Sequence, residues 1–283
     1  LLISKKIRSS GIKVALSGDG GDELFGGYNR HIYGPLINIL FSKHPKFLKK
    51  IFSELIYKFP TNKRGLKLDK KKKLMKIINS EPNFNDFYES FLSEQINQDT
   101  SLINNLHNNK NYSLITNEFK DLLIPTMEER ITFADMIAYL ADDILVKIDR
   151  SSMAFGLETR IPFLDKNLVL DALNIPVSMK IRGTKGKLIL KKILNRYIPN
   201  ELHNRPKQGF TPPLSSWLSS SLKDWANDLI NSDNLRSNEY LNYRLIKDDW
   251  NNYLNGKPGY LNNIWCVLIW QSWYNKWINN RTF

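Results

Sequence analysis

The sequence predicts an α/β protein that is predominantly helical. Its opening reads as helix, strand, glycine-rich loop and helix, because Leu1–Ser10 has helical spacing and Ile12–Leu16 is a short apolar run typical of a buried parallel strand. Gly11 suits the end of the first helix. Further along, Met127–Met153 and the tryptophan-striped tail Tyr260–Ile278 have helical periodicity.

One contiguous domain is predicted over residues 1–283, since the chain has neither an internal repeat nor a disordered linker. Hydrophobic residues make up 42% of it, which allows a sizeable core. Residues 34–123 are rich in Lys and Asn and helical in period, with breaks near Pro60 and Pro82. They predict a variable helical region with little chemistry.

The net charge of +13 admits nucleic acid, an anionic membrane or an anionic small substrate as partner. The lysines are scattered among asparagines, and no basic motif is interleaved with aromatic residues. This favours a solvated surface over a nucleic-acid groove. No apolar stretch is long enough to span a bilayer. A single cysteine, Cys266, excludes an intramolecular disulfide and fits a reducing cytoplasm.

The segment SGDGGDELFGGYNRH holds five of the fourteen glycines, between Gly18 and Gly27. A strand, a glycine loop and a helix in this order suit phosphate binding. No lysine follows the glycines; Asp19, Asp22 and Glu23 stand there instead. Since carboxylates repel phosphate unless a cation lies between them, the loop indicates a nucleotide site that contains Mg²⁺. The alternative is a tight turn with a helix-capping aspartate.

SGDGGDELFGGY closely resembles the SG(E/D)G(A/S/G)DE(L/I/V)FGGY segment of asparagine synthetases and their β-lactam synthetase relatives. The resemblance implies part of a pyrophosphatase-type parallel sheet, like that of the adenine-nucleotide alpha hydrolases, together with ATP and Mg²⁺. It places Ser17, Gly18, Gly20 and Gly21 beside ATP and assigns Asp22 to the metal. Asp19 takes the position of the family's catalytic glutamate, which handles protons during ammonia attack and is one methylene longer.

A second matching block, DDILVKIDRSSMAFGLETRIPFLD, spans Asp142–Asp165. Taken as an isolated helix, its approach places Asp135, Asp142 and Asp149 on one stripe and pairs Asp143 with Lys147, which favours a solvated face. The resemblance implies instead a block that lines the synthetase cleft. Its candidates for binding the amino-acid substrate or ordering the cleft are Lys147, Asp149, Arg150, Glu158 and Arg160. Either arginine suits a carboxylate or an internal ion pair.

The third matching block spans Gly183–Leu218 and begins GTKGKLILKKIL. By resemblance, Lys187 at the helix start stabilises the charge on the leaving pyrophosphate. Lys185 is the alternative, and Lys191 and Lys192 are interpreted as surface residues. Lys207, in RPKQGF, is a weaker candidate for the anionic substrate or a phosphate. His31, although near the glycine loop, is interpreted as structural, and the tail tryptophans as core.

The resemblance implies that aspartate and ATP form β-aspartyl-AMP, which ammonia derived from glutamine converts to asparagine. An amino-terminal glutaminase domain and the SGGxDS pyrophosphate loop are absent from these residues, so we expect a fragment of a longer chain with little activity of its own. A homodimer is left open. Two alternatives remain: an amidotransferase acting on another carboxylate, such as a sugar acid of surface polysaccharides, and a catalytically dead basic RNA-binding or scaffold domain.

Overall fold

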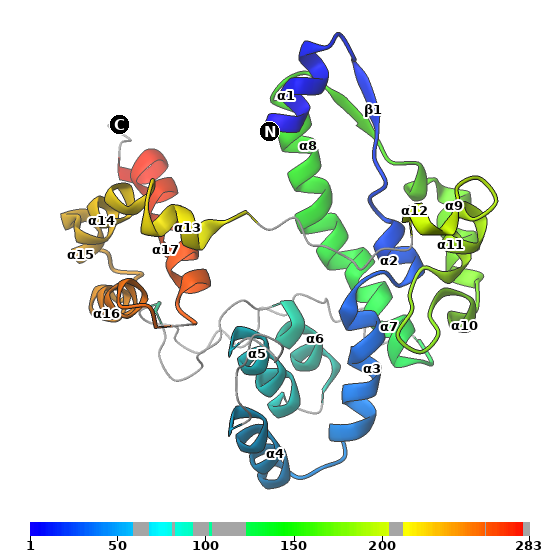
Figure 1. Cartoon of the computed structure of the whole chain (residues 1–283), viewed down its shortest axis with the longest axis horizontal. Helices are drawn as coiled ribbons and strands as arrows, with labels where there is room; N and C mark the ends of the chain where they lie inside the picture. The colour runs from blue at the N-terminus through cyan, green and yellow to red at the C-terminus, as the bar shows by residue number, and fades with distance from the viewer. Residues whose placement is uncertain are drawn as a thin grey trace. The chain divides into compact units, whose positions relative to one another are not determined.

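The structure is a computed structural model that describes residues 1–58, 68–80, 83–92, 102–103, 123–203, 212–257 and 259–279. The chain divides into two compact units. The first comprises Leu1–His44 and Ser113–Pro206, and the second comprises Pro45–Tyr112 and Lys207–Phe283. Helices make up most of both units, and a small parallel sheet lies in the first (Figure 1). The predicted predominance of helix and the parallel sheet are therefore confirmed, whereas the pyrophosphatase-type assignment stays a prediction.

The described elements of the first unit are two short strands and a series of helices. In chain order they are α1 (Leu2–Ser9), β1 (Val14–Leu16), α2 (Gly21–Phe25), α3 (Asn29–Phe41), α7 (Met127–Ala134), the π-helix η2 (Asp135–Leu145), α8 (Val146–Met153), β2 (Glu158–Arg160), the 3₁₀ turn η3 (Pro162–Leu164), α9 (Lys166–Asn174), α10 (Val177–Lys180), α11 (Leu188–Leu194) and α12 (Asn200–His203).

β1 and β2 pair in parallel, with Val14 opposite Glu158 and Leu16 opposite Arg160. α8 packs against β2, and α1 lies along α8 (Figure 1). The strand was predicted from its apolar run, but the prediction that it is buried is wrong. Val14 is 45% and Leu16 75% exposed. Among the described residues only β2 pairs with β1, and a two-stranded sheet cannot cover its own faces.

The predicted long helix from residue 127 to 153 is present as the continuous run α7, η2 and α8. It begins at Thr126, whose hydroxyl accepts a hydrogen bond from the Glu129 N–H while the Glu129 carboxylate accepts one from the Thr126 N–H.

The π-helical segment η2 overturns the predicted aspartate stripe. Asp135 is fully buried, whereas Asp142 and Asp149 are exposed. A π-helix bonds residue i to i+5, so residues seven apart no longer share one side of the helix. Asp143 of η2 and Lys147 of α8 form no ion pair in the described structure.

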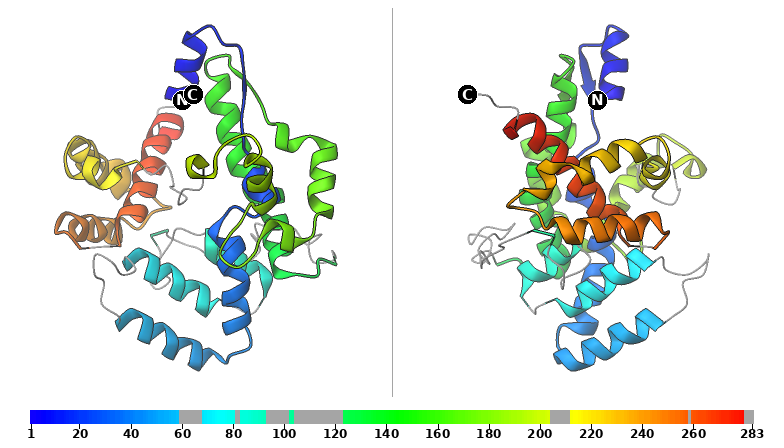
Figure 2. Two further views of the ribbon diagram at one scale, coloured as in Figure 1. Left: turned by 45° about the vertical axis from the view of Figure 1, so that its right-hand side comes forward. Right: turned by 90° about the vertical axis from the view of Figure 1, so that its left-hand side faces the viewer.

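The second unit is helical in all its described elements. They are α4 (Lys46–Lys58), α5 (Leu68–Asn79), α6 (Phe84–Leu92), α13 (Leu214–Ser219), α14 (Lys223–Asn231), α15 (Asp233–Arg236), α16 (Tyr243–Leu254), α17 (Leu261–Tyr274) and the π-helix η4 (Asn275–Asn279). α14 and α16 both pack against α17 (Figures 1 and 2). Their contact buries Ile230, Trp250 and Leu268. The described part of the predicted variable region, 34–123, is largely helical.

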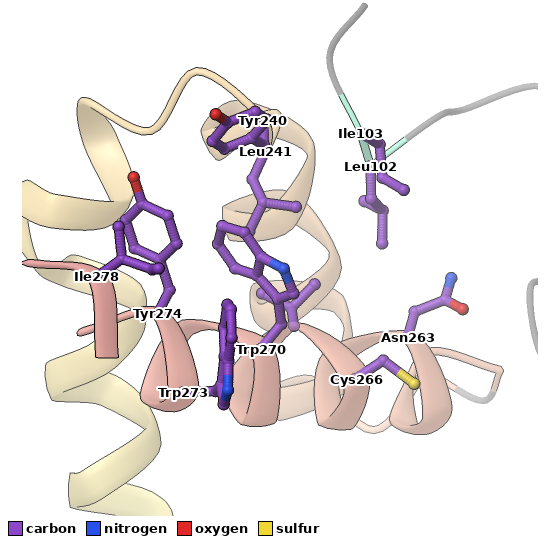
Figure 3. Close-up of a pocket in the computed structure, with 11 residues that line it drawn as sticks. Leu102, Ile103, Tyr240, Leu241, Asn263, Cys266, Trp270, Trp273, Tyr274 and Ile278 are labelled. Carbon is purple, nitrogen blue, oxygen red and sulfur yellow. The ribbon is translucent and has the colours of Figure 1, made fainter. Parts of the chain in front are cut away.

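An apolar hollow of about 630 Å³ lies on α17 in the second unit (Figure 3). Trp270 stacks on Tyr274 at 4.8 Å between ring centroids, and Tyr240 meets both rings edge-on. Among the described residues no charged side chain lines this hollow, so it does not suit a triphosphate. The predicted tail helix is confirmed, but Trp273 and Trp277 are half exposed and do not belong to the core. No described helix has the length and apolar character to traverse a bilayer.

Candidate functional site

The glycine loop follows β1 directly, and α2 begins within it. Ser17 continues the parallel ladder, since its N–H donates to the Arg160 carbonyl at 2.9 Å. The Ser17 hydroxyl donates to the Asp19 carboxylate. Gly20, at the start of α2, has φ +83°, which favours glycine. The predicted strand–loop–helix arrangement is thereby confirmed.

Apolar packing holds α2 in place. Leu24 and Phe25 are buried, together with Ala172 of α9. The Phe25 ring meets the Phe163 ring edge-on at 5.9 Å between centroids, and Ile189 of α11 packs against the same cluster. Leu24 and Phe25 of the motif DELF thus fix α2 against α9 and α11. Asp22, the first residue of the motif, does not belong to this apolar cluster.

Asp22 of α2 forms an ion pair with Lys187, whose Nζ lies 2.8 Å from Oδ1 of the aspartate. The two side chains are 26% and 32% exposed, so water reaches both. The Lys187 N–H donates to the Phe25 carbonyl at 3.1 Å. Lys187 also has φ +57°, a left-handed conformation that costs a residue with a side chain about 1–3 kcal/mol. Such conformations cluster at functional sites.

Two glycines make this ion pair sterically possible. A Cβ atom on Gly27 would overlap the Asp22 carboxylate and crowd the Lys187 side chain. A Cβ atom on Gly186 would overlap the Gly26 carbonyl oxygen. The backbones before α3 and before α11 therefore approach more closely than any larger residue allows, which explains the FGGY and KGK glycines physically.

A cavity of about 440 Å³ lies beside the ion pair. Gly18 and Gly21 of the loop line it on one side. Its remaining lining comes from η3, α11 and the residues just after α11: Phe163, Lys187, Leu190, Lys191, Ile193, Leu194 and Tyr197. The structure therefore combines a glycine loop, two lysines and an apolar wall in one cavity.

The predicted site residues divide into those at the cavity and those away from it. Gly18, Gly21 and Lys187 line the cavity, Asp22 adjoins it through its ion pair with Lys187, and Gly20 is buried against Leu164. Ser17 and Asp19 pair with each other at the base of the loop. Lys185 is exposed and forms an isolated backbone bridge with Arg182. Lys207 lies outside the described residues.

The candidates of the second block lie on α8 and β2. Lys147, Asp149 and Arg150 are exposed on α8 and do not line the cavity. Arg160 pairs with Glu158 at 2.6 Å, with both side chains more than half exposed. Their roles towards a substrate stay predictions.

Lys191 was missed as a cavity residue. Sequence reasoning interpreted Lys191 and Lys192 alike as surface residues, whereas only Lys191 lines the cavity and Lys192 is exposed. The available signal was its spacing: Lys191 is four residues after Lys187, and residues i and i+4 share one side of an α-helix.

A buried polar cluster connects α2 and the start of α3 with η2. Glu23, which is 1% exposed, accepts a hydrogen bond from the Tyr28 hydroxyl at 2.7 Å. The Arg30 guanidinium lies over the Tyr28 ring at 4.1 Å and bonds Asp135 through Nε at 2.7 Å. His31 Nε2 lies 2.5 Å from the same carboxylate. The cluster ties the loop after α2 to η2.

Burial and hydrogen bonding set the charge states in this cluster. Burial lowers the pKa of the His31 imidazole, and the neighbouring Asp135 carboxylate opposes that only in part. Burial by itself would raise the pKa of Asp135, but the His31 hydrogen bond and the Arg30 charge outweigh it and lower that pKa. Burial and the hydrogen bond to Glu23 raise the pKa of Tyr28. His31 is thus neutral, Asp135 ionised and Tyr28 protonated at neutral pH.

His31 should make the stability of the protein depend on pH. An unfolded histidine binds a proton near pH 6.5, whereas folded His31 resists it, so the unfolded state binds more protons below that pH and stability falls as pH falls. We expect the free energy of unfolding to drop more between pH 7.5 and 5.5 for the native protein than for His31→Gln, whose amide keeps a donor towards Asp135. Equal drops in urea unfolding would show that His31 does not carry this dependence.

Among the described residues no three His, Cys, Asp or Glu side chains are grouped to hold a metal by themselves. Mg²⁺, however, keeps several waters and is commonly bound through one or two carboxylates together with substrate phosphates. Asp22, partly exposed beside the cavity, meets that requirement. A carboxylate has two oxygens with several lone pairs, so its contact with Lys187 does not exclude a metal.

Comparison with known proteins finds relatives that match most of the chain. The chain is 29% identical over 271 residues to asparagine synthetase [glutamine-hydrolyzing] 1 of Bacillus subtilis, covering 95% of this chain and 41% of that protein. It is 28% identical over 273 residues to a putative asparagine synthetase of Mycobacterium bovis, covering 93% of the chain and 39% of the relative. A putative asparagine synthetase of Methanocaldococcus jannaschii is 33% identical over 144 residues, 50% of the chain and 26% of the relative.

The chain thus spans about two fifths of the length of the first two relatives. No solved structure shows a significant match. The model of the family described as "Asparagine synthase" matches residues 1–275, which include parts of both compact units. The chain therefore belongs to the asparagine synthase family.

Proposed function

We propose that the protein carrying this chain uses ATP to convert aspartate to asparagine, and that the cavity beside Asp22 and Lys187 binds the nucleotide. The observation that carries the proposal is the ion pair between these two residues, beside the cavity that the glycine loop lines. This ion pair brings the acidic glycine loop together with a lysine that is distant in the sequence. Family membership supports ATP-dependent amidation in general.

In the proposed reaction a β-carboxylate oxygen of aspartate attacks the α-phosphorus of ATP. The bond to pyrophosphate breaks, and β-aspartyl-AMP forms. The nitrogen of ammonia then attacks the activated carbonyl, the bond to AMP breaks, and a proton leaves the nitrogen. Lys187 stabilises the negative charge that builds on the departing pyrophosphate, because a fixed cation beside developing charge lowers the barrier.

Asp19 is proposed to accept the proton from the attacking amine. Its carboxylate already accepts a hydrogen bond from Ser17, which orients it at the end of β1. Among the described residues Asp19 makes no ion pair with Lys187. We propose separate tasks for the two residues: proton transfer for Asp19 and charge stabilisation for Lys187.

Asp22 would hold Mg²⁺, which when bound supplies positive charge to the phosphates. Gly18 and Gly21 lie where the backbone can approach the nucleotide closely, and Gly20 and Ser17 shape the same loop. Lys147, Asp149, Arg150, Glu158, Arg160 and Lys207 are proposed to bind aspartate or order its cleft.

Ammonia is proposed to come from glutamine, as the names of the relatives indicate for those proteins. A glutaminase domain would supply it. A reducing, cytoplasmic setting is proposed for the chain, which has a single cysteine. Because the relatives are more than twice as long as this chain, we expect residues 1–283 alone to have little activity.

Pyrophosphate release tests the proposal. With the whole protein that carries this chain, we expect release from ATP to require aspartate and to yield one asparagine per pyrophosphate when ammonia is present. Release that ignores aspartate but requires a sugar acid would keep the adenylation and refute the substrate. If no acid supports any release and nucleotide does not bind, while RNA binds with steep salt dependence, the scaffold alternative would replace the enzyme.

A further inference from the structure

We infer that Lys191 is a second phosphate-contacting side chain of the cavity beside the Asp22–Lys187 ion pair. This inference rests on the proposed function, because it concerns the same cavity. It adds a residue that the sequence motifs did not single out. The ligand class is an anion that bears phosphate groups and has an apolar part.

Lys191 contributes the positive charge of the cavity that is not balanced by a described carboxylate. Lys187 is neutralised locally by Asp22 at 2.8 Å. Within the described residues no carboxylate lies at ion-pair distance from Lys191. Among the described lining residues the ionisable side chains are Lys187, Lys191 and Tyr197, so this part of the cavity carries net positive charge. Such a cavity attracts anions.

Helix geometry places the two lysines within reach of one ligand. They are separated by one turn of α11, about 6 Å along the axis at the usual rise per residue. Lys187 N–H and carbonyl are both bonded, to the Phe25 carbonyl and the Lys191 N–H, so the backbone of this turn is fixed. Two ammonium groups carried on one helical turn can contact the separate phosphates of a pyrophosphate group.

The rest of the lining explains the apolar part of the ligand. Phe163, Leu190, Ile193 and Leu194 form an uncharged wall next to the two lysines. Phe163 is itself held by its edge-on contact with Phe25. An anion bound here would lie between a positive turn of α11 and an apolar surface, which suits a nucleotide more than inorganic phosphate.

The adjacent Lys192 is a matched control for Lys191. Both residues lie on α11, both are lysines, and only Lys191 lines the cavity. Glutamine and lysine have similar helix propensity, so neither Lys→Gln change should weaken α11. Circular dichroism and thermal melting check that both variants fold like the native protein.

Pyrophosphate and ATP binding, measured by calorimetry on the whole protein without aspartate, test the inference. We expect Lys191→Gln to weaken both about tenfold or more, the usual loss for a hydrogen bond to a charged group. Lys192→Gln should change them less than twofold, and Lys191→Arg should restore most of the affinity. AMP, which lacks the two outer phosphates, should be affected least.

Equal effects of the Lys191 and Lys192 changes would overturn the inference, because the loss would then reflect general surface charge. Absence of any pyrophosphate or ATP binding by the native protein would overturn it as well. Aspartate takes no part in these measurements. A protein that binds pyrophosphate through Lys191 but does not act on aspartate would therefore refute the proposed function and leave the Lys191 site standing.

Discussion

Replacing Lys187 with alanine should lower aspartate-dependent pyrophosphate release by about 100-fold or more. Lys187 lines the cavity and its ammonium group lies 2.8 Å from Asp22, so it can stabilise charge on a pyrophosphate that departs there. Loss of one fixed charge-stabilising group usually costs 10²–10³ in rate, roughly 2.7–4 kcal/mol. The measurement is kcat and KM for ATP in the whole protein.

Two controls distinguish the loss of the ammonium charge from a loss of folded protein. Stability should hardly change in Lys187→Ala, since an ion pair that water reaches contributes about 0–1 kcal/mol. Lys187→Gly also removes the ammonium group but relieves the left-handed backbone at φ +57°. It should be as inactive as the alanine variant and at least as stable. Near-native turnover in either variant would remove Lys187 from the mechanism.

Replacing Asp135 with alanine should destabilise the protein by about 3–5 kcal/mol, the usual cost of breaking a buried ion pair from one side. Asp135 is fully buried and accepts hydrogen bonds from Arg30 and His31. Without it the mostly buried Arg30 guanidinium loses its counter-charge and His31 loses its acceptor. The cluster also holds Tyr28, so the loop after α2 should loosen.

Asp142 provides the matched control, because it lies on the same π-helix and is exposed. Asp142→Ala should change the free energy of unfolding by no more than about 0.5 kcal/mol. Urea unfolding of the native protein and both variants measures the difference. Similar small losses in the two variants would show that the buried cluster does not stabilise this unit.

Local sequence was enough to predict the elements that position the site. Apolar spacing predicted α1, the long run from residue 127 to 153 and the tail helix, and the glycine run predicted the loop between β1 and α2. These features depend on interactions between residues close in the chain, which a reading of periodicity and turn chemistry captures. The resemblance of short motifs added Asp22 and Lys187 as partners in one site.

The environment of each side chain was not predictable in the same way. The same four-letter spacing describes Asp143–Lys147, which forms no ion pair in the described structure, and Lys187–Lys191, which shares a cavity. The difference lies in what each pair faces: α11 packs against α2 beside the cavity, whereas Asp143 and Lys147 are both exposed at the junction of η2 and α8. Likewise Asp135 is buried and Asp142 exposed although both lie on the same π-helix.

The sequence by itself determined the predominantly helical α/β character, the glycine loop after a strand and the residue types that bear the chemistry. Only the tertiary structure decided that Asp22 contacts Lys187, that Lys191 rather than Lys192 lines their cavity, and that β1 remains exposed. Periodicity records which side of an element a residue occupies. What that side meets depends on segments far away in the chain, and there burial and electrostatics assign each residue its surroundings.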